Sequence, residues 1–430
     1  MKPSKIIILI VFLLLIAGGV YWYMFFYGPG NGNPGTNSIP NNGSSGGFVP
    51  IGGPTGNPTS DQTQNQNSTI NDNPNPATTT QSTNTPRQTL RLLSKEPVGG
   101  YGASTTASST IIRWIERGRG NVLETRGDTD EIITLSNTVL PRMYESIWNK
   151  DLSSLIGTLL PANSDTPNVV FAKLNKQSTS TLATTTNVTP YNLRGKNLPD
   201  NMLAYAISPK KDRLFMLIKE NGQGVGYISK FDGTSVTKIF TQPLTQVVVE
   251  WPEENNIAIT TKAGSSISGY LYFINPKTGI WKKIIGPITG LATKVSKDAK
   301  FVLTSSTGKE QNIVTNIYKV GSTTPIETTL RTLAEKCTWG NFYKELLYCA
   351  TPSIPTNGTY PDDWYKGIIS SNDKIWQYNI KSADVRLIAN LLNSNSLINA
   401  FNLNTDSKDD YLFFINKDDL SLWSLDLVGI

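Results

Sequence analysis

The stretch that decides the fold is YAISPKKDRLFMLI, Tyr205–Ile218, in which a charged break separates a short apolar run from a longer one. Similar stretches begin at Trp148, Ile207, Trp251, Val295, Trp339 and Leu403, at intervals of 59, 44, 44, 44 and 64 residues. Three equal intervals indicate an internal repeat, and the two longer ones indicate the same unit with an inserted loop. Counting back 44 residues from Trp148 leads to Ser104, which marks a degenerate first copy.

Each repeat contains further segments typical of strands. Segments such as GVGYISKFDG (224–233) and GYLYFINPKTG (269–279) are short, rich in β-branched and aromatic residues, and end in turn residues. Four such strands in a unit of 44 residues are typical of a β-propeller blade. A pair of β-sandwich domains, the alternative, does not require a constant interval.

The repeats number seven when counted from Ser104, but the last has room for only three strands before Ile430. These are INAFNL (398–403), DYLFFIN (410–416) and SLWSLDL (421–427). We expect TLRLLS, Thr89–Ser94, to supply the missing outer strand, because this closes the ring and covers an exposed sheet edge. The sequence therefore predicts an all-β protein with one propeller over 89–430, most simply of seven four-stranded blades, with counts of six and eight left open.

The first 88 residues differ from the rest in composition. Ile6–Tyr27 is an uncharged stretch of 22 residues, long enough as a helix to cross a bilayer. Lys2 and Lys5 precede it and no Lys or Arg follows before Arg87, so the positive-inside rule places residues 1–5 in the cytoplasm and the rest outside. A cleaved signal peptide is the alternative.

Residues 28–88 consist almost entirely of Gly, Pro, Asn, Ser, Thr and Gln. Such a segment cannot bury enough apolar surface to offset the entropy lost on ordering, and we expect a disordered linker. The sequence thus predicts a single-pass membrane protein whose propeller is tethered outside the cytoplasm.

Two stretches resemble known propeller families. The turn SPKKDRL (208–214) resembles the Ser-Pro-Asp-Gly-Lys turn of TolB-type, WD-repeat-like propellers. The segment 335–367, EKCTWGNFYKELLYCATPSIPTNGTYPDDWYKG, is similar to membrane-anchored extracytoplasmic propellers of small-genome bacteria. The resemblance implies the fold and the topology and carries no activity.

Composition excludes several classes of chemistry. The chain contains no His and two Cys, which removes the commonest general base, the commonest transition-metal ligand and every Ser-His or Cys-His nucleophile. The formal net charge of +6 comes from scattered Lys and Arg, without the basic stripe of a nucleic-acid-binding surface. We therefore expect no cofactor, no metal and no nucleic-acid partner, and the sequence identifies no catalytic residue.

Cys337 and Cys349 flank a turn and fall opposite each other in an antiparallel hairpin centred near Tyr343. Outside the cytoplasm such a pair is expected to form a structural disulfide. A redox or metal-binding pair, the alternative, lacks a CxxC spacing.

The candidate ligand loop is YPDDWYKG, 360–367, inside the longest insertion. Asp362, Asp363, Trp364 and Tyr365 together combine carboxylates with aromatic rings, which suits a sugar or Ca²⁺. In the alternative interpretation, the Asp pair starts one helical turn and Trp364 packs against the blade below.

Two functions are compatible with these features. The first is a non-enzymatic binding or scaffolding module whose propeller face binds a protein, a peptide or a cell-envelope glycan. The second is a carboxylate-based envelope hydrolase or lyase acting on polysaccharide.

Overall fold

The computed structural model describes residues 90–136, 138, 140–162, 166–177, 191–354, 357–393 and 397–428. The chain divides into two units, Met1–Thr80 and Gln81–Ile430, and all described residues belong to the second. The predicted anchor, Ile6–Tyr27, and the predicted linker, 28–88, lie outside the described residues. Within the described ranges, no helix has the length and apolar character needed to cross a bilayer.

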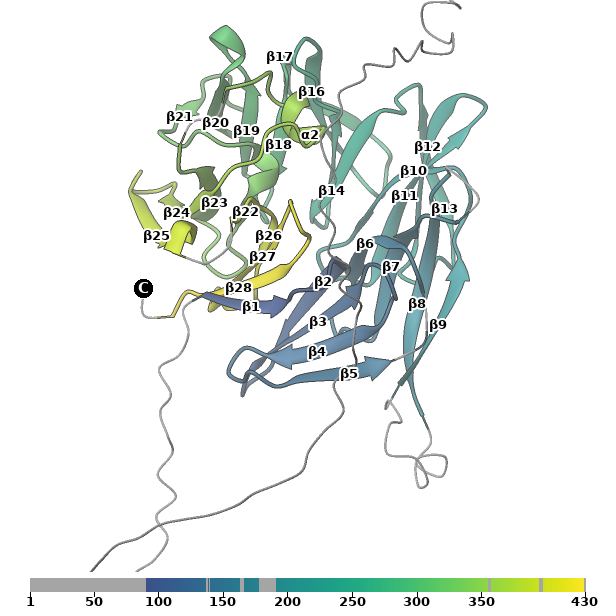
Figure 1. Ribbon diagram of the computed structural model, residues 1–430. Helices are drawn as coiled ribbons and strands as arrows, with labels where there is room; N and C mark the ends of the chain where they lie inside the picture. Colours follow the sequence, from purple (N-terminus) through teal and green to yellow (C-terminus); the bar gives the residue numbers. More distant parts are fainter. Residues whose placement is uncertain are drawn as a thin grey trace, which may run out of the picture. The chain divides into compact units, whose positions relative to one another are not determined.

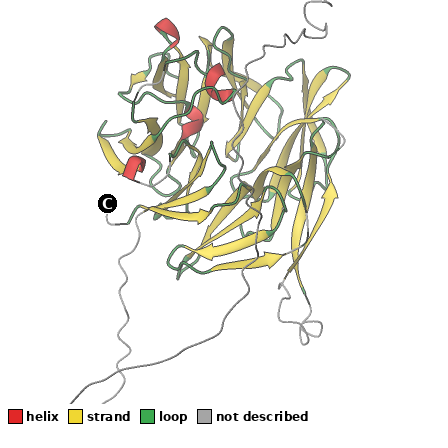
Figure 2. Ribbon diagram, viewed as in Figure 1, coloured by secondary structure: helices red, strands yellow, loops and turns green. Residues whose placement is uncertain are grey.

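Strands dominate the described residues (Figure 2) and form seven antiparallel sheets of four strands each (Figure 1). We call these sheets blades 1 to 7. Blades 1 to 3 consist of β2 (Val98–Thr105), β3 (Thr110–Glu116), β4 (Val122–Arg126) and β5 (Ile132–Ser136); β6 (Met143–Trp148), β7 (Ser154–Leu159), β8 (Asn168–Lys176) and β9 (Tyr191–Asn197); and β10 (Met202–Ile207), β11 (Arg213–Glu220), β12 (Gln223–Lys230) and β13 (Thr237–Gln242).

Blades 4 to 7 follow the same order along the chain, except that the last blade takes its fourth strand from the start of the domain. They consist of β14 (Val247–Glu253), β15 (Asn256–Thr261), β16 (Ser268–Ile274) and β17 (Trp281–Thr289); β18 (Ala292–Val295), β19 (Phe301–Thr307), β20 (Ile313–Lys319) and β21 (Ile326–Glu327); β22 (Cys337–Trp339), β23 (Leu346–Pro352), β24 (Asp373–Asn379) and β25 (Val385–Asn390); and β26 (Ala400–Thr405), β27 (Tyr411–Asn416), β28 (Leu422–Asp426) and β1 (Leu90–Ser94).

Helical structure is limited to single turns in the described part of the chain. They are α2 (Asp362–Tyr365) and the 3-10 turns Lys309–Gln311, Ala334–Lys336 and Leu391–Asn393.

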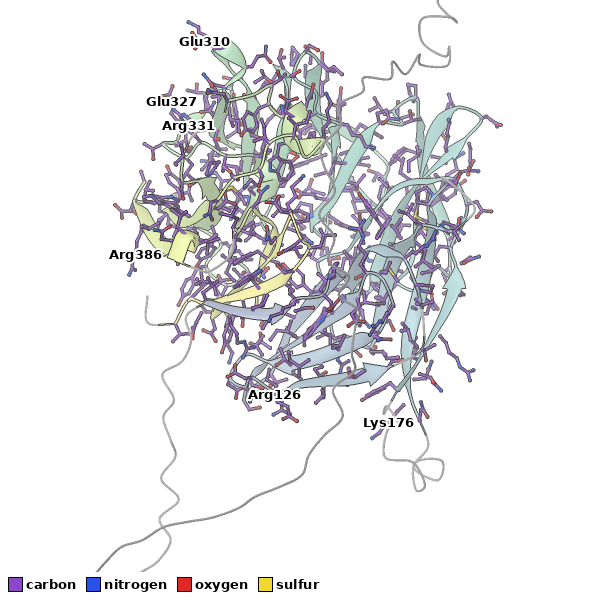
Figure 3. All side chains as sticks on the ribbon, in the orientation of Figure 1. Arg126, Lys176, Glu310, Glu327, Arg331 and Arg386 are labelled. Carbon is purple, nitrogen blue, oxygen red and sulfur yellow. A yellow bond between two sulfur atoms is a disulfide. The ribbon has the colours of Figure 1, made fainter. Side chains whose placement is uncertain are left out.

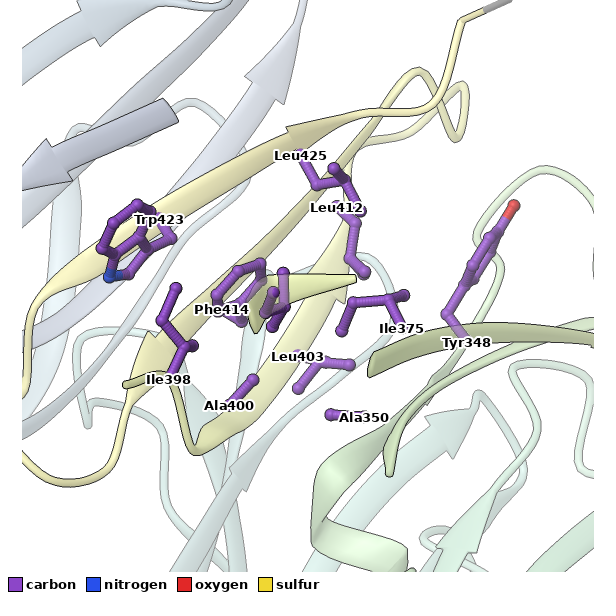
Figure 4. Packing of buried hydrophobic residues seen from close by; sticks show 11 residues of the cluster. Tyr348, Ala350, Ile375, Ile398, Ala400, Leu403, Leu412, Phe414, Trp423 and Leu425 are labelled. Carbon is purple, nitrogen blue, oxygen red and sulfur yellow. The ribbon is translucent and has the colours of Figure 1, made fainter. Parts of the chain in front are cut away.

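The blades close into a ring because an apolar cluster lies between each blade and the next, including between blade 7 and blade 1. Figure 4 shows the cluster between blades 6 and 7, where Tyr348 and Ile375 of one blade face Leu403 and Phe414 of the other. The first strands of neighbouring blades, such as β2 and β6 or β18 and β22, contact each other. The first strand of each blade is therefore the innermost, next to the axis of the ring.

The predicted repeat is confirmed. Trp148, Ile207, Val295 and Trp339 are each the last residue of a first strand, and Trp251 lies near the end of another. An apolar residue recurs here because this end of each innermost strand packs into the cluster shared with a neighbouring blade. The extra residues of the long repeats lie in the β8–β9 connection and in 353–372, between β23 and β24.

Ring closure by the start of the domain is also confirmed. β1 pairs antiparallel with β28, and Leu90 lies opposite Leu425. Leu93 is buried in the cluster between blades 7 and 1, while Leu90 and Leu92 pack on the opposite face against the cluster between blades 6 and 7. One strand thus covers the edge of blade 7 and contributes to both of its interfaces.

Candidate functional site

A cavity of about 700 Å³ lies at one end of the ring axis. Its walls are the innermost strands of six of the seven blades, all but blade 3, together with the insertion 353–372. Such a position, where strands from many blades converge around the axis, brings together side chains that are far apart in the sequence.

Charged groups line this cavity. Lys294 Nζ and Glu250 Oε1 form an ion pair at 2.7 Å, and Glu250 Oε2 accepts a hydrogen bond of 3.0 Å from the backbone N–H of Val295. By contrast, charged residues such as Arg126, Lys176 and Arg386 lie at the periphery of the propeller (Figure 3). The charges at the axis are thus held in fixed positions by the innermost strands.

Glu145 and Glu335 also line the cavity. Burial raises the pKa of Glu145, although a hydrogen bond with Tyr205 opposes the shift. Burial likewise raises the pKa of Glu335, against the hydrogen bond that Tyr365 donates to it and the charge of Lys294. The cavity therefore contains two carboxyl groups that retain a proton at higher pH than a Glu in free solution does.

Two polar atoms of the cavity wall make no hydrogen bond with the part of the chain that the structure describes. They are Ser146 Oγ and Glu335 Oε2, both buried. A buried polar atom without a partner costs free energy, which a bound ligand or an ordered water can recover. Because both atoms are buried within the wall, a ligand in the cavity would not contact them without a shift of the wall.

The insertion 353–372 runs from blade 6 across blade 5 to blade 4. Asp362 accepts two hydrogen bonds from the β15–β16 loop of blade 4, from the Ser265 backbone N–H at 3.0 Å and from Ser265 Oγ at 2.8 Å. Thr307 of blade 5 donates to the Tyr360 carbonyl at 2.9 Å. The middle of the insertion is therefore fixed to two neighbouring blades, and α2 lies close to β16 and β18 (Figure 1).

The four residues of the predicted ligand loop divide into two pairs. Trp364 and Tyr365 line the cavity, whereas Asp362 and Asp363 do not. Asp363 Oδ2 accepts a hydrogen bond of 2.8 Å from the Thr359 N–H within the insertion. Trp364 is buried, and the Lys417 Nζ lies 4.9 Å from the centre of its ring. In this structure, the carboxylates hold the insertion in place and the aromatic side chains face the axis.

The two cysteines form a disulfide, and they are paired residues on β22 and β23 with a Cα–Cα distance of 4.1 Å. Both are buried between blades 5 and 6. The bridge lies in the middle of packed structure, where it joins the innermost strand of blade 6 to the next strand.

Sequence reasoning missed Glu145, Glu250, Lys294 and Glu335. A signal was present for three of them. Glu250 and Lys294 each precede the recurring apolar residue by one position, and Glu145 precedes Trp148 by three. Residues at odd offsets from that apolar residue share one face of the strand, here the face toward the axis. Glu335 lies just outside β22 and gives no such signal.

No family model and no curated protein matches the sequence. Among solved structures, the chain is similar to TolB from Acinetobacter baumannii (11% identity, 72% of this chain and 60% of that chain, TM-score 0.39). It is also similar to oligogalacturonate lyase from Vibrio parahaemolyticus (9% identity, 79% of this chain and 94% of that chain, TM-score 0.49). A further similar structure is the propeller domain of the Trilobed protease from Pyrococcus furiosus (10% identity, 75% of this chain and 94% of that chain, TM-score 0.47).

The chain spans less than two thirds of that TolB chain. The resemblance to TolB-type propellers is confirmed at the level of the fold, by the seven four-stranded blades themselves.

Proposed function

We propose that the chain is a membrane-tethered extracytoplasmic propeller that binds a protein, a peptide or a cell-envelope glycan at the cavity on its axis. The observation that carries the proposal is a cavity of about 700 Å³ whose wall combines the Glu250–Lys294 ion pair with the aromatic side chains of Trp364 and Tyr365. A wall that combines apolar and aromatic surface with a few fixed charges is suited to binding, because these groups are already in place before a ligand arrives.

The proposal is tested by filling the cavity. Val248 lines it and is 53% exposed, so Val248→Trp adds volume inside the cavity with little disturbance of the core. Val236, in the β12–β13 turn, is 50% exposed and does not line the cavity. With the full chain as bait in envelope extracts, we expect Val248→Trp to lose the captured partner and Val236→Trp to keep it. Equal capture by both variants would contradict binding at this site.

The location outside the cytoplasm is a separate part of the proposal and is supported by the charge asymmetry around Ile6–Tyr27. A protease added to intact spheroplasts should cut within 28–88 and release a fragment that contains the propeller. Protection of this fragment until the membrane is broken would show the opposite orientation.

One observation favours the second function, a hydrolase or lyase acting on polysaccharide. Glu145 and Glu335 line the same cavity, and burial raises the pKa of both, as a general acid near neutral pH requires. Turnover of envelope polysaccharide by the wild type that is lost in Glu335→Gln would establish this function in place of binding alone.

A further inference from the structure

Lys336, Asp373 and Asn399 form a buried cluster at the boundary of blades 6 and 7. Their exposed fractions are 2%, 0% and 0%. Lys336 precedes β22, Asp373 begins β24, and Asn399 precedes β26. The three residues are 26 to 63 positions apart in the sequence, so only the fold brings them together.

The Lys336 amine is surrounded by acceptors. Its Nζ lies 2.9 Å from Ser371 Oγ, 2.7 Å from Asn399 Oδ1, and within 3.0 Å of both oxygens of Asp373. Because the carbonyl carbon is bonded to this oxygen, the Asn399 Cγ lies within about 3–4 Å of Nζ, close to the separation of about 3–3.5 Å at which an attack begins.

Burial favours the neutral form of both Lys336 and Asp373. It lowers the pKa of Lys336, with the charge of Asp373 opposing the shift, and it raises the pKa of Asp373, with Lys336 opposing. Both directions favour a neutral amine beside a carboxylic acid over a buried ion pair. A neutral lysine amine in a dry pocket is a nucleophile.

The amide of Asn399 is held at both of its ends. Besides the lysine, its Oδ1 receives hydrogen bonds from Ser371 Oγ at 3.3 Å and from Trp364 Nε1 at 3.4 Å. Donors in this position stabilise negative charge that develops on a carbonyl oxygen under attack. Its Nδ2 donates to Asp418 Oδ1 at 3.2 Å, and Asp418 is exposed, so the nitrogen that would leave lies next to a surface residue.

We propose that Lys336 and Asn399 join in an intramolecular isopeptide bond. The lone pair of the neutral Nζ attacks Asn399 Cγ, and the carbonyl electrons move onto Oδ1. Asp373 gives its proton to Nδ2 and takes one from Nζ. The intermediate then collapses, the Cγ–Nδ2 bond breaks and ammonia leaves. The products are a secondary amide between Nζ and Cγ, one ammonia molecule and a protonated Asp373, with no oxidant or cofactor required.

The bond would connect the chain just before β22 with the chain just before β26 and so bracket the whole of blade 6. The same blade contains the disulfide and supports the insertion, which contributes Trp364 to the cluster. A covalent clamp at this point would hold blade 6 against blade 7 and keep the insertion in place beside the cavity.

The test is the mass of the purified full chain after reduction of the disulfide. We expect the wild type to be lighter than its sequence by one ammonia molecule, and a digest to contain a branched peptide joining Lys336 to Asn399. Lys336→Arg and Asp373→Asn should have the full sequence mass. Asn399→Asp should form the link with loss of water in place of ammonia.

Lys417→Arg is the matched control, because the Lys417 amine also lies against Trp364, 4.9 Å from the centre of its ring, but takes no part in the proposed link. This variant should keep the ammonia loss. A wild-type chain of full mass overturns the proposal, whatever the variants do. An ammonia loss that persists in Lys336→Arg, without a branched peptide, overturns it as well.

Discussion

Removal of residues 1–96 should lower the free energy of unfolding by about 5 kcal/mol or more and convert a monodisperse protein into an aggregating one. The deletion removes β1, which pairs with β28 along its length. It takes away the buried Leu93 from the interface of blades 7 and 1 and the packing of Leu90 and Leu92 on the other face. Each of these side chains contributes about 1.5–3 kcal/mol when fully buried.

Two further consequences make this deletion severe. All five residues of β28 are buried in the complete ring, and without β1 this strand becomes an exposed apolar edge that can pair with another molecule. Arg91 also joins β1 to the turn after β4, where its guanidinium donates to the Arg126 carbonyl at 2.8 Å and contacts Thr129. The deletion therefore frees blade 1 as well as blade 7.

Removal of residues 1–88 is the control, since it leaves the whole of β1 in place. This shorter deletion should have the melting temperature and the size-exclusion profile of the intact propeller. The two deletions differ by eight residues, so any difference between them belongs to the closing strand. Equal stability of the two proteins would mean that β1 does not hold the ring closed.

The blades and their closure were predictable because their signals are local and repeated. Trp148, Trp251 and Trp339 recur at matching points of the repeat, since each innermost strand meets the same neighbours. The incomplete last repeat required a fourth strand, and Thr89–Ser94 was the apolar segment at the other end of the domain. Likewise, Cys337 and Cys349 are close in sequence, and one hairpin was enough to pair them.

The cavity was predictable only in part, through Trp364 and Tyr365 of the candidate loop, and the buried cluster was not predictable, because both depend on pairs of residues that only the closed ring brings together. Asp362 is fixed by Ser265, 97 residues away, and no property of the stretch YPDDWYKG indicates that partner. Nothing in the sequence around Lys336 distinguishes it from a surface lysine. It is buried because blade 7 and the insertion pack around it. Sequence patterns report the face that a residue occupies, whereas the contacts across the axis depend on the ring.

Asp409→Ala should destabilise the propeller by about 3 kcal/mol while leaving its own turn intact. Asp409 lies in the β26–β27 turn, is 6% exposed, and reaches across to blade 6. Its carboxylate accepts hydrogen bonds from the backbone N–H groups of Asn341 at 2.8 Å, Phe342 at 3.1 Å and Tyr343 at 2.8 Å. A side chain at Gly340 would prevent this approach, because its Cβ would lie 2.7 Å from Asp409 Oδ2.

The repeat itself provides the reason to expect that the turn survives. Asp409 has a φ of 59°, and the equivalent residues Ala299 in blade 5 and Lys211 in blade 3 have φ values of 54° and 56°. Alanine is therefore already tolerated at this left-handed position in blade 5, so the loss in Asp409→Ala belongs to the hydrogen bonds of the carboxylate, three from blade 6 and one from Thr405 Oγ1 in its own blade, and not to backbone strain. Hydrogen bonds to a charged acceptor contribute about 1.5–3 kcal/mol each. The net loss is smaller than their sum, because water can bind the partly exposed N–H groups once the carboxylate is gone.

Lys211→Ala is the matched control, since it introduces alanine at the same left-handed φ, and a lysine amine cannot accept hydrogen bonds from a neighbouring blade. Chemical denaturation of both variants should give a loss of about 3 kcal/mol for Asp409→Ala and a change within about 1 kcal/mol for Lys211→Ala. Similar losses in the two variants would mean that the left-handed turn, and not the contact with blade 6, determines the stability at this position.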